Sequence, residues 1–283
     1  MKSILLLGER GKVGTALNSE LAKSYNIIGK NSENFNVADF EGVTSLIDNY
    51  KPDIVINTVA AQGIDDCERN PERSLRINSL YPKLLAELSN KFEFLLVNFS
   101  TECVFKDNEP GNFFIEADRP CPLNVYGLTK YGGDCFVSNI AHRHYIFRLP
   151  ILFGPSNKNN QFVERMLDKA LNQGEKLKVS CDVITSPSYS IDIAKAVKEI
   201  IENEMPYGLY HLSNQGAASI YDLMKEIFSN LEVEVELEKV SHKSFQSIGI
   251  KNTNTPLKSS KIKSLRPWQE AVADYCKYIK DNF

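Results

Sequence analysis

Two tyrosine and lysine pairs lie four residues apart in this chain, Tyr126 with Lys130 and Tyr221 with Lys225. Residues at this spacing share one face of a helix, so either pair would bring a phenol close to an ammonium group. Composition alone would supply about one such pair in a chain with this many tyrosines and lysines. The position of each pair in the fold must therefore decide which of them, if either, does chemistry.

The surroundings favour the pair formed by Tyr126 and Lys130. These residues open an expected helix between two expected strands, and the strand upstream ends in Thr101. Doubly wound parallel sheets bind their ligands at the carboxyl ends of the strands. The second pair lies beyond the sheet, where an ordinary helix face explains it.

A hydroxyl, a phenol and an ammonium group together suit hydride transfer to a carbonyl, because the new alkoxide must take up a proton. A free phenol has a pKa of about 10, and bringing it near 7 requires about 4 kcal/mol of preference for the phenolate. Lys130 and a positively charged nicotinamide would each contribute on the order of 1–4 kcal/mol in a partly dry cleft. Thr101 would hydrogen-bond the carbonyl oxygen and hold it beside Tyr126.

A glycine-rich turn follows the first expected strand. Gly8, Gly11 and Gly14 form a GxxGxxG pattern directly after the apolar run at residues 4–7. Such glycines allow a sharp turn and a close approach to a pyrophosphate, which the amides of the next helix would bind. A tight strand-to-helix turn would explain the same pattern. Its place at the start of the chain favours dinucleotide binding.

Two cations lie where the adenosine ribose of a dinucleotide would bind. An NAD-preferring site holds the ribose 2′-hydroxyl with an acid about 20 residues after the glycines, but Lys30 occupies that place. Arg10 lies within the glycine loop itself. Two cations suit a 2′-phosphate, so we expect NADPH, with NADH as the alternative donor; solvated surface charge is the other explanation.

The order of apolar runs predicts the fold. Runs at residues 4–7, 26–28, 54–57, 94–100 and 145–149 alternate with helical patterns, as buried parallel strands do. We expect an α/β fold, with a Rossmann-like doubly wound parallel sheet and a smaller mixed α/β C-terminal substrate-binding lobe. Residues 1–152 with about 191–213 would form the NAD(P)-binding domain, and about 153–190 with 214–283 the substrate-binding lobe.

Composition excludes several classes of protein. The 283 residues are 42% hydrophobic and 24% charged, so the chain can bury a sizeable core. Its net charge of -3, with scattered lysines and arginines, argues against nucleic acid as a partner. The first apolar run is too short for a signal peptide and no stretch approaches membrane-spanning length, so we expect a cytoplasmic protein without a membrane partner. The six cysteines lack metal-ligand spacing, and no metal is expected.

With these motifs in one order, the chain resembles the dTDP-4-dehydrorhamnose reductase family of the extended short-chain dehydrogenase/reductases. The resemblance runs over essentially the whole chain and is carried by STECVF and YGLTK and by residues 51–60, 64–78, 124–134, 208–219 and 266–272. It implies a reductase that uses NAD(P)H to reduce the 4-keto group of a nucleotide-diphospho-6-deoxysugar, as in dTDP-rhamnose biosynthesis. The enzyme would act as a monomer or homodimer.

The resemblance also implies roles for individual residues. Thr101, Tyr126 and Lys130 are the catalytic set, with Tyr126 as the acid. The residues expected to contact the cofactor are Gly8, Arg10, Gly11, Lys12, Val13, Gly14, Lys30, Asn36, Val37, Thr58, Val59, Ala60, Tyr126 and Lys130. Those expected to contact the substrate are Thr101, Glu102, Val104, Phe105 and Arg165. Arg165 is the candidate for the substrate diphosphate, although an exposed helix charge explains it equally well.

The chain departs from the family pattern on the sugar side. The usual STDYVF is STECVF here, RTSWVYG becomes RLPILFG, and the region corresponding to GSPT reads TSPS at residues 185–188. A reductase or epimerase of a different nucleotide sugar is therefore one alternative. Another is an NADP-binding subunit without turnover, resembling the regulatory subunit of methionine adenosyltransferase. The intact Thr101, Tyr126 and Lys130 argue against the second alternative.

Overall fold

Six parallel strands form the central sheet, in the order β10-β5-β4-β3-β1-β2. The computed structural model describes residues 1–156, 161–172 and 176–282. The strands are β1 (Ser3–Leu7), β2 (Asn26–Lys30), β3 (Ile54–Asn57), β4 (Leu95–Thr101), β5 (His144–Leu149) and β10 (Gly208–His211). Because the chain runs from β1 outward to β2 and then back to β3, the direction of winding reverses between β1 and β3. Sheets of this kind bind their ligands at that reversal.

The register aligns the strand ends that carry the predicted site. Leu7 at the end of β1 lies opposite both Lys30 of β2 and Asn57 of β3, and Thr101 of β4 lies opposite Leu149 of β5. The loops that follow β1, β3 and β4 therefore leave the sheet along one edge.

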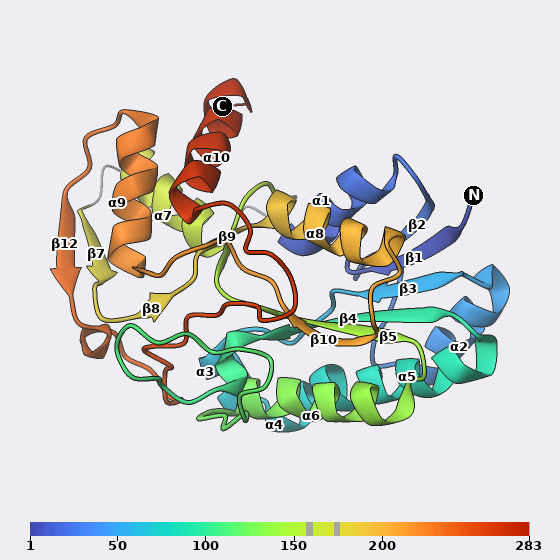
Figure 1. Cartoon of the computed structure of the whole chain (residues 1–283). Coiled ribbons are helices and arrows are strands. Elements are labelled where there is room, and N and C mark those ends of the chain that lie inside the picture. The colour runs from blue at the N-terminus through green and yellow to red at the C-terminus, as the bar shows by residue number, and fades with distance from the viewer. Residues whose placement is uncertain (157–160, 173–175, 283) are drawn as a thin grey trace.

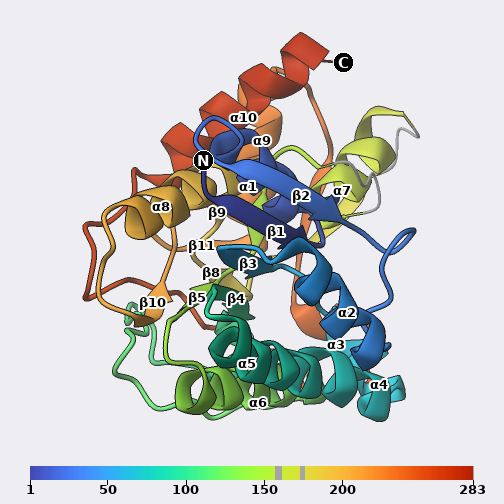
Figure 2. The ribbon, with the colours of Figure 1, turned by 90° about the vertical axis from the view of Figure 1, so that its right-hand side faces the viewer.

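Helices cover both faces of the sheet (Figures 1 and 2). One face carries α1 (Lys12–Leu21) and α8 (Ser190–Glu202), and the other carries α2 (Phe40–Tyr50), α3 (Ile64–Arg69), α4 (Pro71–Leu75), α5 (Tyr81–Phe92) and α6 (Val125–Ile140). Apolar residues at helical spacing make these contacts, since Leu17 and Leu21 of α1 and Val197 of α8 are fully buried in one cluster with the sheet. The doubly wound parallel sheet expected from the sequence is confirmed.

A second group of elements lies beyond the carboxyl ends of the strands (Figure 1) and is called the C-terminal lobe below. It contains β6 (Leu152–Phe153), α7 (Phe162–Leu171), β7 (Leu177–Ser180), β8 (Ile184–Thr185), β9 (Ser188–Tyr189), β11 (Ala218–Ser219), α9 (Ile220–Leu231), β12 (Leu237–Val240) and α10 (Trp268–Asn282). Its core draws all its buried members from residues 153–190 and 214–282. The division into a cofactor domain and a substrate lobe stays a prediction.

One helix expected from the sequence is divided in the structure. Residues 74–91 have a continuous helical pattern, but a π-helical turn (Arg76–Leu80) separates α4 from α5. Pro82 follows this turn, and a proline ring cannot sit beside the carbonyl four residues earlier, which is that of Asn78. The wider π turn accommodates this proline.

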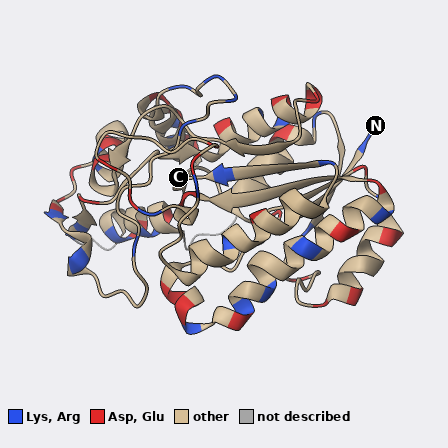
Figure 3. Cartoon of the chain, turned by 60° about the horizontal axis from the view of Figure 1, so that its bottom comes forward, with Lys and Arg blue, Asp and Glu red and all other residues tan. Residues whose placement is uncertain are grey.

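The surface carries charges of both signs. Lysine and arginine alternate with aspartate and glutamate over the helices that cover the sheet (Figure 3). Among the residues that the structure describes, no helix combines the length and the apolar character that crossing a membrane requires.

Candidate active site

The glycine-rich loop lies where the winding of the sheet reverses. The Thr58 hydroxyl, directly after β3, donates to the carbonyl oxygens of Leu7 (2.9 Å) and Gly8 (3.0 Å) and so ties the loops after β1 and β3 together. Gly11 is the N-cap of α1, and within the described part of the chain no side chain caps this helix. Since an uncapped first turn leaves its amides available, α1 presents an anion-binding end.

Asp39 caps α2, Asn124 caps α6 and Ser219 caps α9, whereas α5, α7 and α8 begin without a side-chain cap in the described part of the chain, as α1 does. The position of α1 directly after the glycine loop, and not the missing cap alone, therefore favours an anion at its first turn. A Cβ atom on Gly14 would lie 2.3 Å from the carbonyl oxygen of Gly8, so only glycine allows α1 to begin this close to β1. The loop therefore fits the pyrophosphate of a dinucleotide.

The two cations predicted for a 2′-phosphate have partners within the protein. Arg10 forms an ion pair with Glu33. The Lys30 ammonium lies 4.9 Å above the Tyr50 ring and donates to the Tyr50 hydroxyl at 3.1 Å. A contact of either cation with a cofactor phosphate therefore requires that these pairs open or share their charge.

Lys12 was expected to contact the cofactor, but its side chain contacts the protein instead. Its buried ammonium donates to the Leu152 carbonyl (3.2 Å) and lies 3.1 Å from the Glu164 carboxylate of α7. Burial lowers the pKa of Lys12, and Glu164 partly offsets this. The side chain thus joins the glycine loop to the C-terminal lobe. If Lys12 contacts the cofactor, it does so through its backbone amide.

The remaining predicted cofactor residues lie around the same loops. Val37 and Val59 pack against the buried cluster of Ala61, Cys67 and Ile77, which the Tyr126 ring also contacts. Val13 packs against the core of the sheet, Ala60 is half-buried, and the exposed Asn36 accepts from the Ala38 amide at 3.0 Å. The structure therefore places Tyr126 beside the loop that follows β3.

The catalytic candidates come together at the end of β4. The Thr101 hydroxyl lies near enough to the Tyr126 hydroxyl to lower the pKa of the phenol. Lys130, one turn further along α6, is 4% exposed, and its ammonium donates to the Phe99 carbonyl of β4 at 2.5 Å. Asp134, a turn further still, lies close enough to raise the pKa of Lys130.

Three local contacts fix the start of α6 and so position Tyr126. The Asn124 side chain accepts from the Gly127 amide at 2.8 Å, and the Glu68 carboxylate of α3 accepts from the Val125 amide at 2.9 Å. A carboxylate is favourable at this positive end of a helix. A Cβ atom on Gly127 would lie only 2.1 Å from the Cys103 carbonyl, so glycine allows α6 to approach the turn after β4.

Burial raises the pKa of the Tyr126 phenol, and the nearby Thr101 hydroxyl lowers this pKa by less. The sequence predicted a phenol acidified toward 7, so the surroundings within the chain act in the opposite direction. Desolvation outweighs the neighbouring groups because the phenolate would lie in a site of low dielectric. A raised pKa keeps Tyr126 protonated, which is the form that an acid catalyst requires.

A buried ion pair lies behind Lys130. The Asp134 carboxylate accepts from the Ser100 hydroxyl at 2.8 Å and from the Arg148 guanidinium at 3.1 Å. Burial lowers the pKa of Lys130 to about 8, and the charge of Asp134 limits the decrease. Asp134 thus helps to keep an ammonium in the core. Sequence reasoning missed this residue, although its spacing of four from Lys130 was a signal.

Asn78 is a second positioning residue that sequence reasoning missed. Its side chain accepts from the Ala61 amide at 2.9 Å and donates to the Ala61 carbonyl at 3.0 Å and to the Thr129 hydroxyl at 3.1 Å. It therefore joins the loop after β3 to α6. An asparagine within an expected helix was the available signal, because Asn disfavours helix interiors.

Glu102 makes its contacts with the protein rather than facing open space. The Thr185 hydroxyl of β8 donates to its carboxyl at 2.6 Å. The Ile151 amide and the Thr255 hydroxyl lie near enough to lower the pKa of this carboxyl, although by less than burial raises it. Burial raises the pKa of Glu102 to about 8. Glu102 and Thr185 are both departures from the family pattern, and the structure shows that they contact each other.

The other residues predicted to contact the substrate are divided between core and surface. Val104 and Phe105 are both 0% exposed, and the Phe105 ring stacks on Phe114 at 4.2 Å. Their side chains belong to the core, so a contact of Val104 or Phe105 with a substrate would have to come from the backbone, and it stays a prediction. Arg165 lies exposed on α7. Cys103, whose thiol pKa burial raises to about 12, lies beside the Tyr126 hydroxyl.

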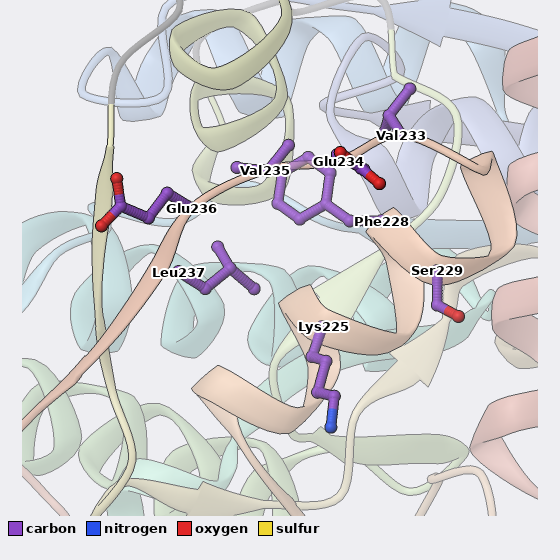
Figure 4. A pocket seen from close by; sticks show the side chains of 8 residues that line it. All are labelled: Lys225, Phe228, Ser229, Val233, Glu234, Val235, Glu236 and Leu237. Atoms are coloured by element: carbon purple, nitrogen blue, oxygen red, sulfur yellow. The ribbon is translucent and has the colours of Figure 1, made fainter.

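A hollow of about 470 Å³ lies elsewhere, on the C-terminal lobe between α9 and β12 (Figure 4). It is lined by Lys225, Phe228, Ser229, Val233, Glu234, Val235, Glu236 and Leu237. Lys225 belongs to the second tyrosine and lysine pair, and the Tyr221 ring faces the Lys239 ammonium at 4.7 Å. None of the three catalytic candidates lines this hollow. The candidate active site is therefore the group of Thr101, Tyr126 and Lys130 at the end of β4, and not this hollow. The second pair lies on an ordinary helix face.

Comparison with known proteins gives matches over nearly the whole chain. The family profile described as the RmlD substrate binding domain matches residues 1–280. A spore coat polysaccharide biosynthesis protein of Bacillus subtilis, SpsK, is 29% identical over 97% of both chains. The dTDP-4-dehydrorhamnose reductase of Escherichia coli is 31% identical over 80% of this chain and 77% of its own length.

Solved structures show the same architecture. The dTDP-4-dehydrorhamnose reductase of Bacillus anthracis, in complex with NADP, superimposes with a TM-score of 0.91 at 26% identity and covers 99% of both chains. The corresponding Clostridium acetobutylicum structure gives a TM-score of 0.90 at 27% identity, covering 98% of this chain and 99% of its own.

We predict that Gly127→Ala destabilises the protein and separates Tyr126 from Thr101. The new methyl group would meet the Cys103 backbone at 2.1 Å, which is not a flexible neighbour. Overpacking of this kind costs about 1–3 kcal/mol. Urea unfolding measures the loss. Leu128→Ala is the matched control, since Leu128 is 58% exposed on the same turn. Equal unfolding midpoints for the two variants would contradict the close approach of α6.

We also predict a pH dependence of stability that Glu102 causes. Its pKa is raised in the folded protein from the ordinary 4.5 to about 8, so its contribution is complete below 4.5 and is lost as the pH rises toward 8. Glu102→Gln should therefore flatten the decline in unfolding free energy across this range by up to about 5 kcal/mol. The control is Glu87→Gln, because Glu87 is a surface residue paired with Lys83. Identical pH profiles for wild type and Glu102→Gln would refute the assignment.

Proposed function

Because the chain belongs to the RmlD substrate binding domain family, we propose that it reduces the 4-keto group of a nucleotide-diphospho-6-deoxysugar with a hydride from NADPH or NADH. The best-supported substrate is dTDP-4-dehydrorhamnose, since relatives of this chain that cover most of its length are described as reductases of that compound. The chain is an oxidoreductase. A regulatory subunit without turnover is not favoured.

One observation supports the reaction most directly, namely that the Tyr126 and Thr101 hydroxyls lie near each other at the end of β4. A substrate carbonyl oxygen next to both hydroxyls would receive a hydrogen bond from Thr101 and a proton from Tyr126. The uncapped end of α1 lies along the same edge of the sheet. The proposed proton donor and the proposed binding site of the hydride donor therefore lie along the same edge of the sheet.

The bound dinucleotide supplies the hydride that reaches the carbonyl carbon. Thr101 orients the carbonyl oxygen, and Tyr126 donates its phenolic proton to that oxygen as the carbon–oxygen double bond becomes an alcohol. The Lys130 ammonium, held against β4 by the Phe99 carbonyl, stabilises the phenolate left on Tyr126 until solvent returns the proton. Asp134 positions this chemistry by keeping Lys130 charged.

The two parts of the fold have separate tasks in this proposal. The sheet and its glycine loop bind NADPH or NADH, and the C-terminal lobe binds the nucleotide of the substrate. The exposed cation of Arg165 on α7 suits the substrate diphosphate, and Lys12 connects this helix to the cofactor loop through Glu164. A cytoplasmic location and a monomeric or homodimeric state stay predictions.

A second candidate keeps the reaction and changes the sugar. The Glu102 carboxyl accepts a hydrogen bond from Thr185 of the C-terminal lobe, which competes with a sugar hydroxyl for this group. Since both Glu102 and Thr185 depart from the family pattern, this contact favours a different nucleotide-linked keto-sugar. Turnover of NADPH with a panel of such sugars separates the two candidates.

We predict that Tyr126→Phe lowers the turnover of a nucleotide-linked keto-sugar by about 10²–10⁴-fold, the usual contribution of a general acid. The dissociation constant of NADPH should change by less than about threefold, because the phenyl ring keeps its packing. NADPH absorbance measures the first quantity and fluorescence titration the second.

Tyr221→Phe is the matched control, because it removes the hydroxyl of the other pair on α9. It should leave both quantities unchanged. Undiminished turnover of Tyr126→Phe would remove this residue from the mechanism.

A further inference from the structure

The carboxylate of Glu9 lies at the carboxyl end of β2. Its Oε1 atom accepts from the Asn31 side chain at 2.8 Å, directly after the strand. Its Oε2 atom lies so close over Gly29 that a Cβ atom on this residue would be 1.6 Å from it. The Gly8 and Glu9 amides both donate to the Lys30 carbonyl, at 2.8 and 3.2 Å, and hold the loop in this place.

This position matters because of what the second strand does in dinucleotide-binding sheets. An acid at its end accepts a hydrogen bond from the adenosine ribose 2′-hydroxyl in NAD-binding proteins. The residue at that point of this sequence is Lys30, so the sequence shows no such acid. The fold supplies the carboxylate from the glycine loop instead, 22 residues earlier than Asn31 in the chain.

The carboxylate has the capacity and the access for such a ligand. Glu9 is half-buried, so part of its side chain is open to the solvent side of the loop. An ionised carboxylate offers about four acceptor positions, and the Asn31 side chain occupies one of them. A ribose hydroxyl would therefore find an acceptor here without breaking the contact with Asn31.

The neighbouring cations do not cancel this negative charge. Arg10 pairs with Glu33, and Lys30 is drawn over the Tyr50 ring of α2. A 2′-phosphate carries a charge of about −1.5 to −2 at neutral pH and would be repelled by a carboxylate within a few ångströms. The same carboxylate would accept a hydrogen bond from a 2′-hydroxyl.

We propose that Glu9 sets the balance between the two nicotinamide cofactors, accepting a hydrogen bond from the 2′-hydroxyl of NADH and opposing the 2′-phosphate of NADPH. The inference rests on the proposed function to the extent that the chain binds a dinucleotide. Glu9 thereby replaces the acid that other NAD-binding sheets carry at the end of the second strand. Arg10 and Lys30 act in the opposite sense, so the chain accepts both cofactors.

The test measures the dissociation constants of NADH and NADPH by fluorescence titration, without any sugar. Glu9→Gln should raise the preference for NADPH over NADH by about tenfold or more, the effect that a lost hydrogen bond to a charged group supports. NADH should bind more weakly and NADPH more tightly than to wild type. Titration with 2′,5′-ADP and 5′-AMP should give the same change, which locates it at the ribose.

A second variant moves the carboxylate without removing its charge. In Gly29→Ala the new methyl group takes the place of Oε2 and pushes the flexible end of Glu9 aside. It should shift the cofactor preference in the same direction. Glu20→Gln is the control, since it removes the same charge from the far end of α1, where Glu20 pairs with Lys23.

The possible outcomes separate the two levels of inference. If neither dinucleotide binds to the wild-type protein, the proposed function fails. If both bind and the ratio of their dissociation constants stays within twofold in Glu9→Gln and Gly29→Ala, the proposal for Glu9 is wrong and the function stands. An equal shift in Glu20→Gln would also overturn it, because net charge would then explain the effect.

Discussion

The close packing of α6 against the carboxyl end of β4 is the constraint on which the rest of the site depends. It brings Tyr126 to Thr101 and buries Lys130 against the Phe99 carbonyl. Gly127 makes the approach possible, and Asn78 ties the same helix to the loop after β3. Because α6 contacts both loops, the hydroxyls of Tyr126 and Thr101 keep a fixed position relative to the loop after β3.

This packing has an electrostatic consequence, since each reactive group is taken partly out of water. Burial favours the neutral forms of Tyr126, Lys130 and Glu102, and it raises or lowers their pKa values accordingly. The protein offsets this cost at Lys130, through Asp134. At Tyr126 the nearby Thr101 hydroxyl offsets less than burial contributes, so the phenol stays a protonated donor. The site thus matches a reduction, in which the phenol must arrive with its proton.

The sequence predicted much of this because local signals and strand order carry it. Five of the six strands and the glycine loop follow from periodicity and from position relative to strand ends, and the same reasoning predicts that Thr101, Tyr126 and Lys130 lie together. Side-chain partners far apart in the sequence could not be predicted in this way. Lys12 and Glu164 are 152 residues apart, and the carboxylate of Glu9 reaches β2 only through the fold. The π turn before Pro82 was not predicted because the helical pattern of residues 74–91 runs through it, although the proline was a local signal.

The most direct test of the central claim is a crystal structure of this protein with NADP and a nucleotide-linked sugar bound together. We expect the reactive carbon of the sugar to lie against the nicotinamide ring, with its oxygen about 2.6–3.2 Å from both the Tyr126 and the Thr101 hydroxyls. A nicotinamide bound away from α6, with these two hydroxyls turned toward solvent, would contradict the proposed chemistry.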